Sequence, residues 1–419
     1  MGKASLMLAI FLFLFSIIIL SKAIYFADMN ESFFWGFYSV ITSLFLLSRI
    51  PLSYLYEDHH ESTAKSGIIY PSTSFIIAVK NEEDSIYETI KSCLDSRYDG
   101  YKECIVVNDG STDNTLKEIY RAKNDFNNSE IKVISFSENR GKREAMAEGI
   151  LTSKMDIVTL VDSDSFLKPD ALRILTEHFS ASNGVAAVSG NTVVRNVDKN
   201  ILTKMQSVRY AASFDIFKTS ESIFGTVTCC PGCFSAYKRE LLLPILSKWR
   251  NQKMFGSRST FGDDRSLTNF VLRDYKVVYC KSAIAETIVP DTYVKFLKQQ
   301  LRWKKSWIRE GLMAATFMWR KNFFAALSFY ANLFLPILGP ILVARIIYKA
   351  VEFGNFSIVG IFVLGVALLG LLFGIYLNIT QRDKNYLYMP VFSLFYMFFL
   401  VWQIPYALIK INDTRWGTR

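Results

Sequence analysis

The sequence predicts a mostly parallel α/β domain inserted between two groups of α-helical transmembrane segments. Hydrophobic residues make up 51% of the 419-residue chain, and they concentrate at its two ends. Between the ends, short β-branched runs alternate with polar, helix-like stretches, a pattern typical of a parallel sheet covered by helices. Acidic and Gly-containing turns follow several of these runs.

Two long apolar runs open the chain, at residues 5–26 and 33–56. Each is long enough to cross the roughly 30 Å hydrocarbon core of a bilayer. A cleaved signal peptide is the alternative for the first run. Its apolar stretch is too long for one, no small-residue cleavage site is obvious, and a second run follows closely. We therefore expect two transmembrane helices within residues 1–56.

Three further apolar stretches lie near the other end of the chain, at residues 322–347, 356–377 and 386–411. The net charge of +10 would also suit a nucleic-acid-binding protein. However, many basic residues stand beside the apolar stretches, which favours a cytoplasmic membrane face and contact with anionic lipid over nucleic acid. They are Arg302, Lys304, Lys305, Arg309, Arg320 and Lys321.

The middle of the chain predicts the sheet domain. Expected strands cover residues 74–79, 103–107, 131–135 and 157–161, and expected helices cover residues 82–96, 113–123 and 142–152. Ligands of such sheets bind beyond the carboxyl ends of the strands. The residues directly after each strand are therefore candidate site residues.

Three polar turns occupy those positions. Asp109 follows the second strand, and Lys142 and Arg143 open the helix after the third. Asp162 and Asp164 follow the fourth strand. Each turn alone could be a loop or a helix cap. Acidic groups and a basic, Gly-containing turn on one sheet edge fit a base, a metal ion and a diphosphate better than three unrelated caps.

Asp162-Ser-Asp164 is the most specific of these motifs. Two carboxylates in a short turn can hold Mg²⁺ or Mn²⁺, which prefer hard oxygen ligands and leave coordination sites for phosphate oxygens. Such an ion would neutralise a departing diphosphate and make it a better leaving group.

A second acidic motif, Gly262-Asp-Asp-Arg265, precedes an expected helical run at residues 266–272. A carboxylate here could accept the proton of an attacking hydroxyl. Acids that satisfy a helix N-terminus are the alternative. Gln299, Arg302 and Trp303 then lie in an amphipathic stretch that is typical of an interfacial membrane helix.

The cysteines are expected to be reduced thiols in the cytosol, because they form no dense framework of the secreted type. They are Cys93, Cys104, Cys229, Cys230, Cys233 and Cys280. Cys230-Pro-Gly-Cys233 has the spacing of a redox or zinc pair. No second pair accompanies it, and the histidines His59, His60 and His178 are far away in sequence. We therefore expect no metal or redox role for this pair.

Taken in order, these motifs resemble the processive family 2 glycosyltransferases, whose GT-A fold is a Rossmann-like α/β domain with a mostly parallel sheet. The resemblance covers residues 74–310, and the apolar segments on both sides also match. Its blocks are Val106-Val-Asn-Asp-Gly-Ser111, Asn139-Arg-Gly-Lys-Arg143, Val161-Asp-Ser-Asp164, Phe261-Gly-Asp-Asp-Arg265 and Gln299-x-x-Arg-Trp303.

Within that family, residues 262–269, residues 293–303 and the terminal Trp416-Gly-Thr-Arg419 resemble the bacterial class I hyaluronan synthases. The chitin and chito-oligosaccharide synthases share several of these blocks. Total length and the two-segment start favour the hyaluronan synthases.

The resemblance implies how the donor would be held. Asp109 would bind the uracil or the ribose of UDP, and Lys142 and Arg143 would lie against the UDP. Asp164, with Asp162 nearby, would hold the metal and the diphosphate.

It also implies the groups around the acceptor. Asp264 would be the general base, and Arg265 would help to orient it. Gln299, Arg302 and Trp303 would line the acceptor and diphosphate site.

Two short segments would complete the site. Cys230 and Gly232 would belong to the acceptor-facing priming loop. Trp416 and Arg419 would return to the cytoplasmic site, where the guanidinium could meet phosphate as a planar fork.

The sequence departs from the family pattern at three positions. Asn108 replaces the usual first acid of the Asp-Asp-Gly block, so donor binding is assigned to Asp109 alone. Lys80 stands where the streptococcal enzymes carry an aromatic residue, and Cys233 replaces a proline of the priming loop.

The terminal motif also constrains the topology. Two early spans and three later ones would put residues 416–419 outside, away from UDP, so the number of later spans should be even. Residues 386–411 carry Pro390 and Pro405, which interrupt helix hydrogen bonding, and aromatic residues that suit an interface. We expect this segment to be interfacial or re-entrant. The true spans are then residues 5–26, 33–56, 322–347 and 356–377.

The expected organisation has five parts. Residues 1–56 form two transmembrane helices, residues 57–289 a cytoplasmic GT-A domain, residues 290–321 amphipathic interface helices, residues 322–411 transmembrane and interfacial helices, and residues 412–419 an active-site segment.

The resemblance implies a multi-pass plasma-membrane enzyme that polymerises and exports hyaluronan from UDP-glucuronate and UDP-N-acetylglucosamine, with Mg²⁺ or Mn²⁺ as cofactor. A chitin or chito-oligosaccharide synthase that uses UDP-N-acetylglucosamine alone is the alternative. A basic membrane scaffold or transporter that binds nucleotide without catalysis is a third reading. This hypothesis is disfavoured, because binding without catalysis does not require acids at several strand ends together with Arg302 and Trp303.

Overall fold

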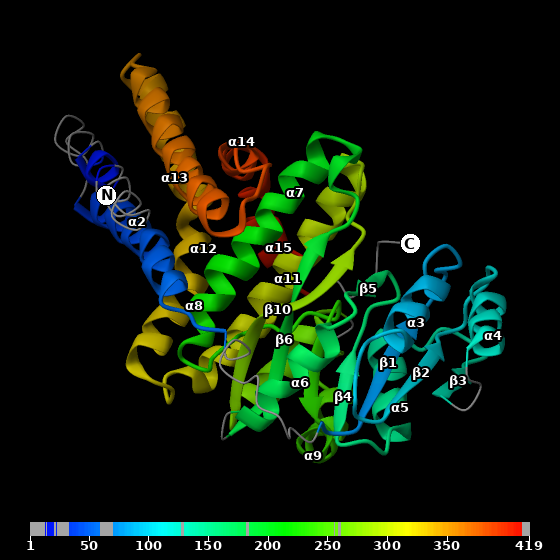
Figure 1. Cartoon of the computed structure of the whole chain (residues 1–419). Helices are drawn as coiled ribbons and strands as arrows, with labels where there is room; N and C mark the ends of the chain where they lie inside the picture. Colours follow the sequence, from blue (N-terminus) through cyan, green and yellow to red (C-terminus); the bar gives the residue numbers. More distant parts are fainter. Residues whose placement is uncertain are drawn as a thin grey trace.

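The computed structural model describes residues 13, 15–20, 22, 33–58, 70–126, 130–181, 184–254, 256–258 and 261–412. Within these residues, an eight-stranded mixed sheet forms the centre of a domain from which long helices project (Figure 1). The strand order is β3-β2-β1-β4-β7-β6-β10-β5.

Four parallel neighbours form one half of the sheet. They are β3 (Ile131–Ser135), β2 (Lys102–Asn108), β1 (Thr73–Val79) and β4 (Ile157–Leu160). β1 pairs with both β2 and β4, and all but one of its residues are buried, as expected for a strand covered on both faces. The four predicted strands are confirmed, with bounds that differ by at most one residue.

The other half of the sheet is mixed. β7 (Ser235–Lys238) runs antiparallel between β4 and β6 (Val185–Val194), β6 is parallel to β10 (Lys276–Thr287), and β5 (Ser165–Leu167) is antiparallel at the edge. A small hairpin of β8 (Lys253–Met254) and β9 (Ser257–Arg258) stands apart. This mixed half was not predicted from the sequence.

Helices cover both faces because successive residues of a strand point to opposite sides. Ile76 of β1 packs in one core with α5, α9 and α10, whereas Phe75 and Ile77 pack in a second core with α3 and α6. The helices are α3 (Ile86–Leu94), α4 (Thr115–Asp125), α5 (Lys142–Thr152), α6 (Ala171–Ala181), α9 (Arg239–Arg250) and α10 (Asp263–Leu272). The three helices predicted before residue 157 are confirmed.

Further helices connect the sheet to the apolar segments. After β6 come η3 (Val197–Lys199), α7 (Ile201–Ala212), the π-helix η4 (Ser213–Lys218) and α8 (Thr219–Ser222). After β10, α11 (Tyr293–Met318) is one continuous helix of 26 residues. Its basic side chains Lys304, Lys305 and Arg309 are buried, so α11 is packed inside the protein along much of its length.

Three helices of the described residues are long and apolar enough to cross a membrane. They are α2 (Phe33–Tyr54), α12 (Phe323–Glu352) and α13 (Ser357–Gln381). α14 (Tyr388–Phe395) continues into the π-helix η5 (Tyr396–Leu400), and this run is bent by 44° against α15 (Gln403–Ile409). The bent run could be a broken span or a re-entrant loop. Most of the expected span at residues 5–26 lies outside the described residues, and the number of spans stays a prediction.

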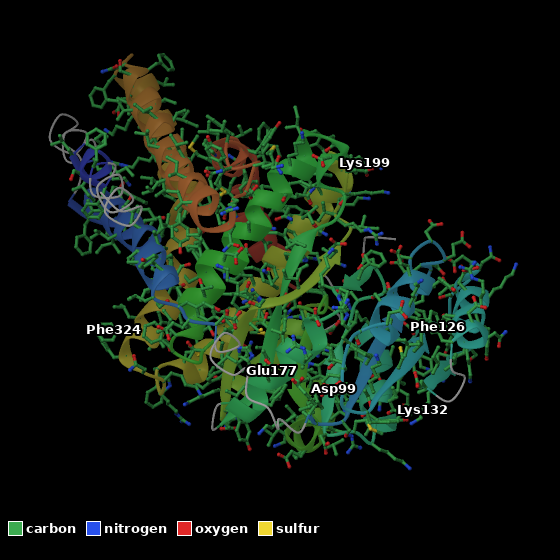
Figure 2. All side chains as sticks on the ribbon, in the orientation of Figure 1. Asp99, Phe126, Lys132, Glu177, Lys199 and Phe324 are labelled. Carbon is green, nitrogen blue, oxygen red and sulfur yellow. The ribbon has the colours of Figure 1, made fainter. Side chains whose placement is uncertain are left out.

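Side-chain chemistry separates the two parts of the molecule. Side chains around α13 are almost entirely carbon, whereas nitrogen and oxygen atoms are dense over the sheet domain, where Lys132, Glu177 and Lys199 lie (Figure 2). Large apolar side chains such as Leu364 and Phe324 are more than half exposed. Lipid would cover such surfaces, and the separation is that of a membrane protein with a polar domain.

Candidate active site

The loop after β2 holds Asp109 at the sheet edge. Asp109 is buried, and its carboxylate accepts hydrogen bonds from the backbone N–H groups of Arg140 (2.6 Å) and Gly141 (3.0 Å). Gly110 has a positive φ of 64° and lies so close to the backbone of Glu138 that no side chain fits there. The turn after β3 is thereby fastened to the turn after β2, next to the start of α5.

Lys142, at the start of α5, reaches across to the turn after β4. Its ammonium forms an ion pair with Asp162. Burial alone would lower the pKa of Lys142, but Asp162 outweighs it, and Asp264 and Asp263 also raise that pKa. Lys142 therefore lies within the field of the acids after β4 and of those at the start of α10.

Asp164 is the second acid of the turn. Burial raises its pKa to about 6, and the negative charge of Asp162 adds to the rise. Lys142 and Arg302 act in the opposite direction. Two carboxylates that repel each other in a partly buried turn are suited to share a divalent cation, which would offset both the desolvation and the repulsion. The residues present thus fit a Mg²⁺ or Mn²⁺ ion.

The loop from Thr228 to Cys233 covers this turn. A Cβ at position 232 would lie 2.6 Å from Asp162 Oδ1, so only glycine allows the observed approach. Cys233 Sγ lies 3.6 Å from Asp162 Oδ2, and Cys229 Sγ lies 3.8 Å from Asp264 Oδ2. The two ends of the loop therefore contact the two acidic groups that the sequence predicted separately.

The predicted loop residue Cys230 takes a different position. It is fully buried in the core, and its backbone N–H donates to Thr268 Oγ1 at 2.9 Å. Burial raises the pKa of its thiol to about 12. Cys230 is therefore an inert core residue, and Gly232, Cys229 and Cys233 are the loop residues that approach the carboxylates.

Side chains that no sequence motif indicates hold the loop in place. Glu221 accepts from Thr228 N–H at 2.9 Å, and Lys218 donates to the carbonyl of Cys229 at 2.5 Å and to Ser189 Oγ at 3.0 Å. Burial raises the pKa of Glu221, and the positive charge of Arg265 partly offsets that rise. Arg265 thus lies near the anchored loop.

Asp264 stands in the first turn of α10 and is only partly buried. One carboxylate oxygen accepts from the Arg265 N–H at 2.8 Å, and the other faces Cys229. Gly262 precedes the helix with a left-handed φ of 75°, and a side chain there would collide with Ser306 of α11. The close packing of α10 against α11 fixes the position of Asp264.

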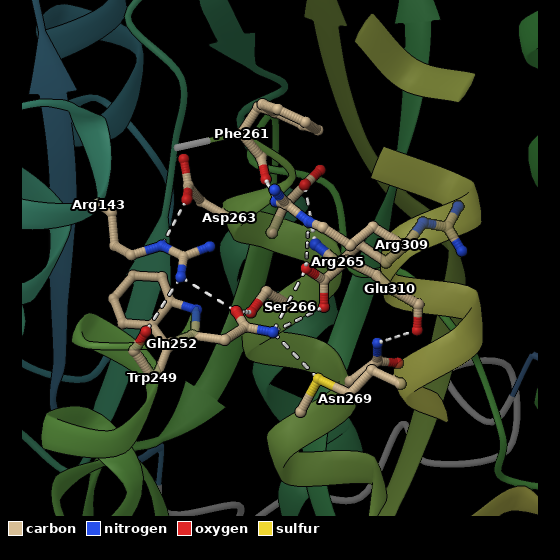
Figure 3. Close-up of polar contacts among 12 residues, drawn as sticks. Arg143, Trp249, Gln252, Phe261, Asp263, Arg265, Ser266, Asn269, Arg309 and Glu310 are labelled. Carbon is tan, nitrogen blue, oxygen red and sulfur yellow. Dashed lines mark hydrogen bonds and ion pairs between the residues drawn. The ribbon is translucent and has the colours of Figure 1, made fainter. Parts of the chain in front are cut away.

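Arg143 is placed differently from what the resemblance implied. It is only 5% exposed, and its guanidinium donates to Asp263 at 2.7 Å and to Trp249 O and Gln252 Oε1 at 3.0 Å each (Figure 3). These contacts join α5 to α9 and α10. Arg143 is therefore placed as an internal connection, not as a group lying against UDP.

The α11 motif is also near the acids. The positive charge of Arg302 partly offsets the rise that burial causes in the pKa of Asp164, and the ring of Trp303 lies 6.2 Å from that of Tyr210 on α7. Burial raises the pKa of Tyr210, which the sequence did not single out, and Cys233, Asp164 and Asp162 add to the rise. Gln299 lies one turn earlier and is partly buried. Trp416 and Arg419 lie outside the described residues.

The acid-lined sheet edge agrees with the GT-A glycosyltransferase class that the sequence motifs resemble, and comparisons with known proteins identify that class. The family model "Glycosyl transferase family 2" matches residues 74–245. N-acetylglucosaminyltransferase of Azorhizobium caulinodans is 30% identical over 356 residues, which cover 83% of this chain and 87% of that protein. Hyaluronan synthase of Streptococcus pyogenes is 28% identical over 428 residues, covering 100% of this chain and 97% of that protein.

The structural comparison agrees on the fold. A mannosyltransferase from Pyrobaculum calidifontis, solved in complex with GDP-Man and Mn²⁺, matches with a TM-score of 0.62 and 18% identity, covering 97% of this chain and 100% of that one. The chain belongs to glycosyl transferase family 2 and is a glycosyltransferase. The predicted family, fold class and enzyme class are confirmed.

Proposed function

We propose that the chain is a membrane-embedded, processive, inverting glycosyltransferase that makes and exports hyaluronan from UDP-glucuronate and UDP-N-acetylglucosamine. One observation supports the chemistry above all: the loop at residues 228–233 contacts Asp162 through Cys233 Sγ (3.6 Å) and Asp264 through Cys229 Sγ (3.8 Å), so a metal-type acid pair and a candidate base lie against the same loop. Similarity to hyaluronan synthase over the whole chain supports the product.

Asp109 and the acids after β4 would hold the donor. Asp109 would bind the uracil or ribose, and Asp164 with Asp162 would hold Mg²⁺ or Mn²⁺. When bound, such an ion stabilises the negative charge of departing UDP. The presence of Mn²⁺ with a nucleotide sugar in the mannosyltransferase structure supports this use of the fold. Lys142 would balance further negative charge on the diphosphate.

Asp264 would act on the acceptor. An acceptor hydroxyl would attack the anomeric carbon of the donor sugar, the bond from that carbon to UDP would break, and Asp264 would take the hydroxyl proton. Arg265 would help to position Asp264. Gln299, Arg302 and Trp303 would line the acceptor and diphosphate site, with Tyr210 beside Trp303.

Cationic side chains beside aromatic rings favour an acidic polymer as product. Lys204 Nζ lies 5.8 Å from the ring centre of Tyr388, and Lys304 Nζ lies 5.0 Å from that of Tyr396. Between them, the Arg209 guanidinium lies 5.9 Å from the Phe392 ring and 5.0 Å from the Trp303 ring. The positive charges of Lys204 and Arg209 would attract carboxylates, which hyaluronan has and chitin lacks.

A chitin or chito-oligosaccharide synthase that uses UDP-N-acetylglucosamine alone is the second candidate. The 30% identity to an N-acetylglucosaminyltransferase favours it. In both cases we propose the organisation expected from the sequence: a cytoplasmic domain at residues 57–289, α11 next to the membrane surface, and membrane segments at both ends of the chain in the plasma membrane.

A two-donor assay tests the proposal. The purified full-length protein is incubated with Mn²⁺ and each UDP-sugar alone or both together, and UDP release and polymer are measured. Hyaluronan synthesis requires both donors and gives a product that hyaluronidase digests. Polymer formed from UDP-N-acetylglucosamine alone and digested by chitinase would establish the second candidate. UDP release that is absent under all conditions would contradict both.

A further inference from the structure

A second cluster of potential ligands lies away from the loop that covers Asp162. It consists of Asp58 from the chain after α2, His178 from α6 and Cys280 from β10. His178 Nε2 lies 3.3 Å from Asp58 Oδ1, and Cys280 Sγ lies 3.8 Å from the same oxygen. The three ligand atoms all lie within 4.8 Å of one another. None of these residues belongs to the catalytic motifs.

Two of the separations match those in a tetrahedral metal site. Zinc bonds of about 2.0–2.1 Å to nitrogen or oxygen and about 2.3 Å to sulfur place a nitrogen and an oxygen ligand about 3.3 Å apart, and a sulfur and an oxygen ligand about 3.6 Å apart. The observed separations are 3.3 Å and 3.8 Å. Thiolate, imidazole and carboxylate together also form a ligand set that suits zinc-type ions better than Mg²⁺.

Outer contacts orient two of the ligands. His178 Nδ1 lies 3.3 Å from the carbonyl of Ile174, and the backbone N–H of Ser282 donates to Asp58 Oδ2 at 2.8 Å. With its proton on Nδ1, His178 donates to that carbonyl and leaves the lone pair of Nε2 for a metal ion. Metal-binding histidines and carboxylates are commonly held by such outer hydrogen bonds.

The burial of the cluster limits the charges that it can hold. The side chains of His178 and Asp58 are 2% and 7% exposed, and Cys280 is fully buried. Burial, and next the charge of Asp58, raise the pKa of the Cys280 thiol well above its usual range, so without a cation the thiol keeps its proton. A divalent ion bound by one thiolate, one carboxylate and a neutral imidazole gives a net charge of zero, and its binding would release the thiol proton.

We propose that Asp58, His178 and Cys280 bind a structural divalent ion of the zinc type, with a fourth position open to water. Its function follows from where the ligands lie. Asp58 is four residues beyond the end of α2, and close to it Tyr56 donates to the carbonyl of Tyr279 at 2.6 Å. The ion would fasten the chain that leaves a membrane helix to α6 and β10, and so set the sheet domain against the membrane. The proposal does not depend on the identity of the polymer.

Metal analysis of the full-length protein tests the site. The protein is purified in detergent through a tag without histidines, and zinc is measured by mass spectrometry. We expect stoichiometric zinc in the wild type and its loss in Cys280→Ser and His178→Gln. Cys93→Ser is the matched control, because Cys93 is a buried cysteine of the same core, and it should retain zinc. Cys233→Ser should also retain zinc, which separates this site from the active-site loop.

Cobalt substitution gives a second readout that depends on the ligands themselves. Co²⁺ bound to the metal-depleted wild type should show thiolate charge-transfer absorption, and Cys280→Ser should lack it. The wild-type spectrum tests thiolate binding even if a variant fails to fold. A wild type that neither contains zinc nor binds added Zn²⁺ or Co²⁺ would overturn the proposal, and so would zinc retained in full by a folded Cys280→Ser.

Discussion

Gly232 and Asp162 approach each other so closely that a methyl group on Gly232 would lie 2.6 Å from the Asp162 carboxylate. The loop that carries Gly232 is held at this distance by hydrogen bonds from outside it, to Glu221, Lys218 and Thr268. The acid turn and the loop therefore occupy positions that depend on each other.

Gly232→Ala should lower kcat while the protein still folds. The added methyl group must displace either the loop or Asp162, and a misplacement of about 1 Å at a reacting site can cost on the order of 10²-fold in rate. UDP release under saturating donor measures the effect. Gly360→Ala is the control, since a Cβ there meets nothing within 4 Å. Unchanged kcat in Gly232→Ala would mean that the loop moves freely away from Asp162.

The pKa of Asp164, raised to about 6, predicts how metal binding depends on pH. The ionised carboxylate is the form that binds metal, so protons compete with Mn²⁺ below that value. The apparent Kd for Mn²⁺ in the presence of UDP should be constant above pH 7 and rise by up to about tenfold per pH unit below pH 6. Calorimetry at several pH values measures it.

Asp164→Asn keeps the size of the side chain and removes its charge. It should abolish most turnover and remove this pH dependence. In the metal-free wild type, the free energy of unfolding should change in the opposite direction. Because folding raises the pKa of the Asp164 carboxyl, its ionised form destabilises the fold. The free energy of unfolding should therefore increase as the pH falls from about 6 toward about 4. Near-normal turnover of Asp164→Asn would contradict the metal assignment.

Asp264→Asn should affect the chemical step and leave donor binding intact. A general base contributes about 10²–10⁴-fold, so kcat should fall by that order while the Kd for UDP stays close to the wild-type value. The adjacent Asp263→Asn is the comparison: Asp263 is buried against Arg143, and its loss should lower the melting temperature. A collapse of UDP binding in Asp264→Asn would place Asp264 in the donor site.

Arg143→Met tests the internal position found for Arg143. Breaking a buried ion pair typically costs about 3–5 kcal/mol, because the remaining carboxylate of Asp263 has no compensating charge. The melting temperature should fall, and the folded fraction should bind UDP normally. Arg140→Met is a matched control, since Arg140 is exposed. A normal melting temperature with weakened UDP binding would restore the donor-site role that the resemblance implied.

Lys142 and Arg143 occupy different environments, and the difference shows what the sequence could predict. Both residues follow the same strand and belong to the same motif, which implied the same UDP-contacting role for both. Successive residues of a helix point about 100° apart, so one faces the acid turn and the other faces the core. The strand-end acids were predictable because parallel strands end at one edge. Glu221, Lys218 and Tyr210 were not, because they follow no strand and gain their meaning only from the tertiary contacts of the π-helical region.

The side of the membrane on which the chain ends depends on whether the bent run at residues 388–409 crosses the membrane. The described residues hold three helices that could span a membrane and one bent run, so spans cannot be counted by length alone. Pro405 lies in the first turn of α15, directly after the bend, where it donates no backbone hydrogen bond. If the bent run is re-entrant, the chain has four true spans: the three described helices and the span expected at residues 5–26. The C-terminus would then return to the cytoplasm.

Thr418→Cys tests this topology in sealed membrane vesicles of known orientation. A membrane-impermeant maleimide is added from each side, in a background where the partly exposed Cys229 and Cys233 are serine. We expect labelling from the cytoplasmic side only. Lys199→Cys, at an exposed lysine of η3, which follows β6, is the control for that side. Labelling of position 418 from outside alone would make the bent run a fifth span and would remove Arg419 from the proposed site, because a guanidinium outside the membrane cannot contact UDP in the cytoplasm.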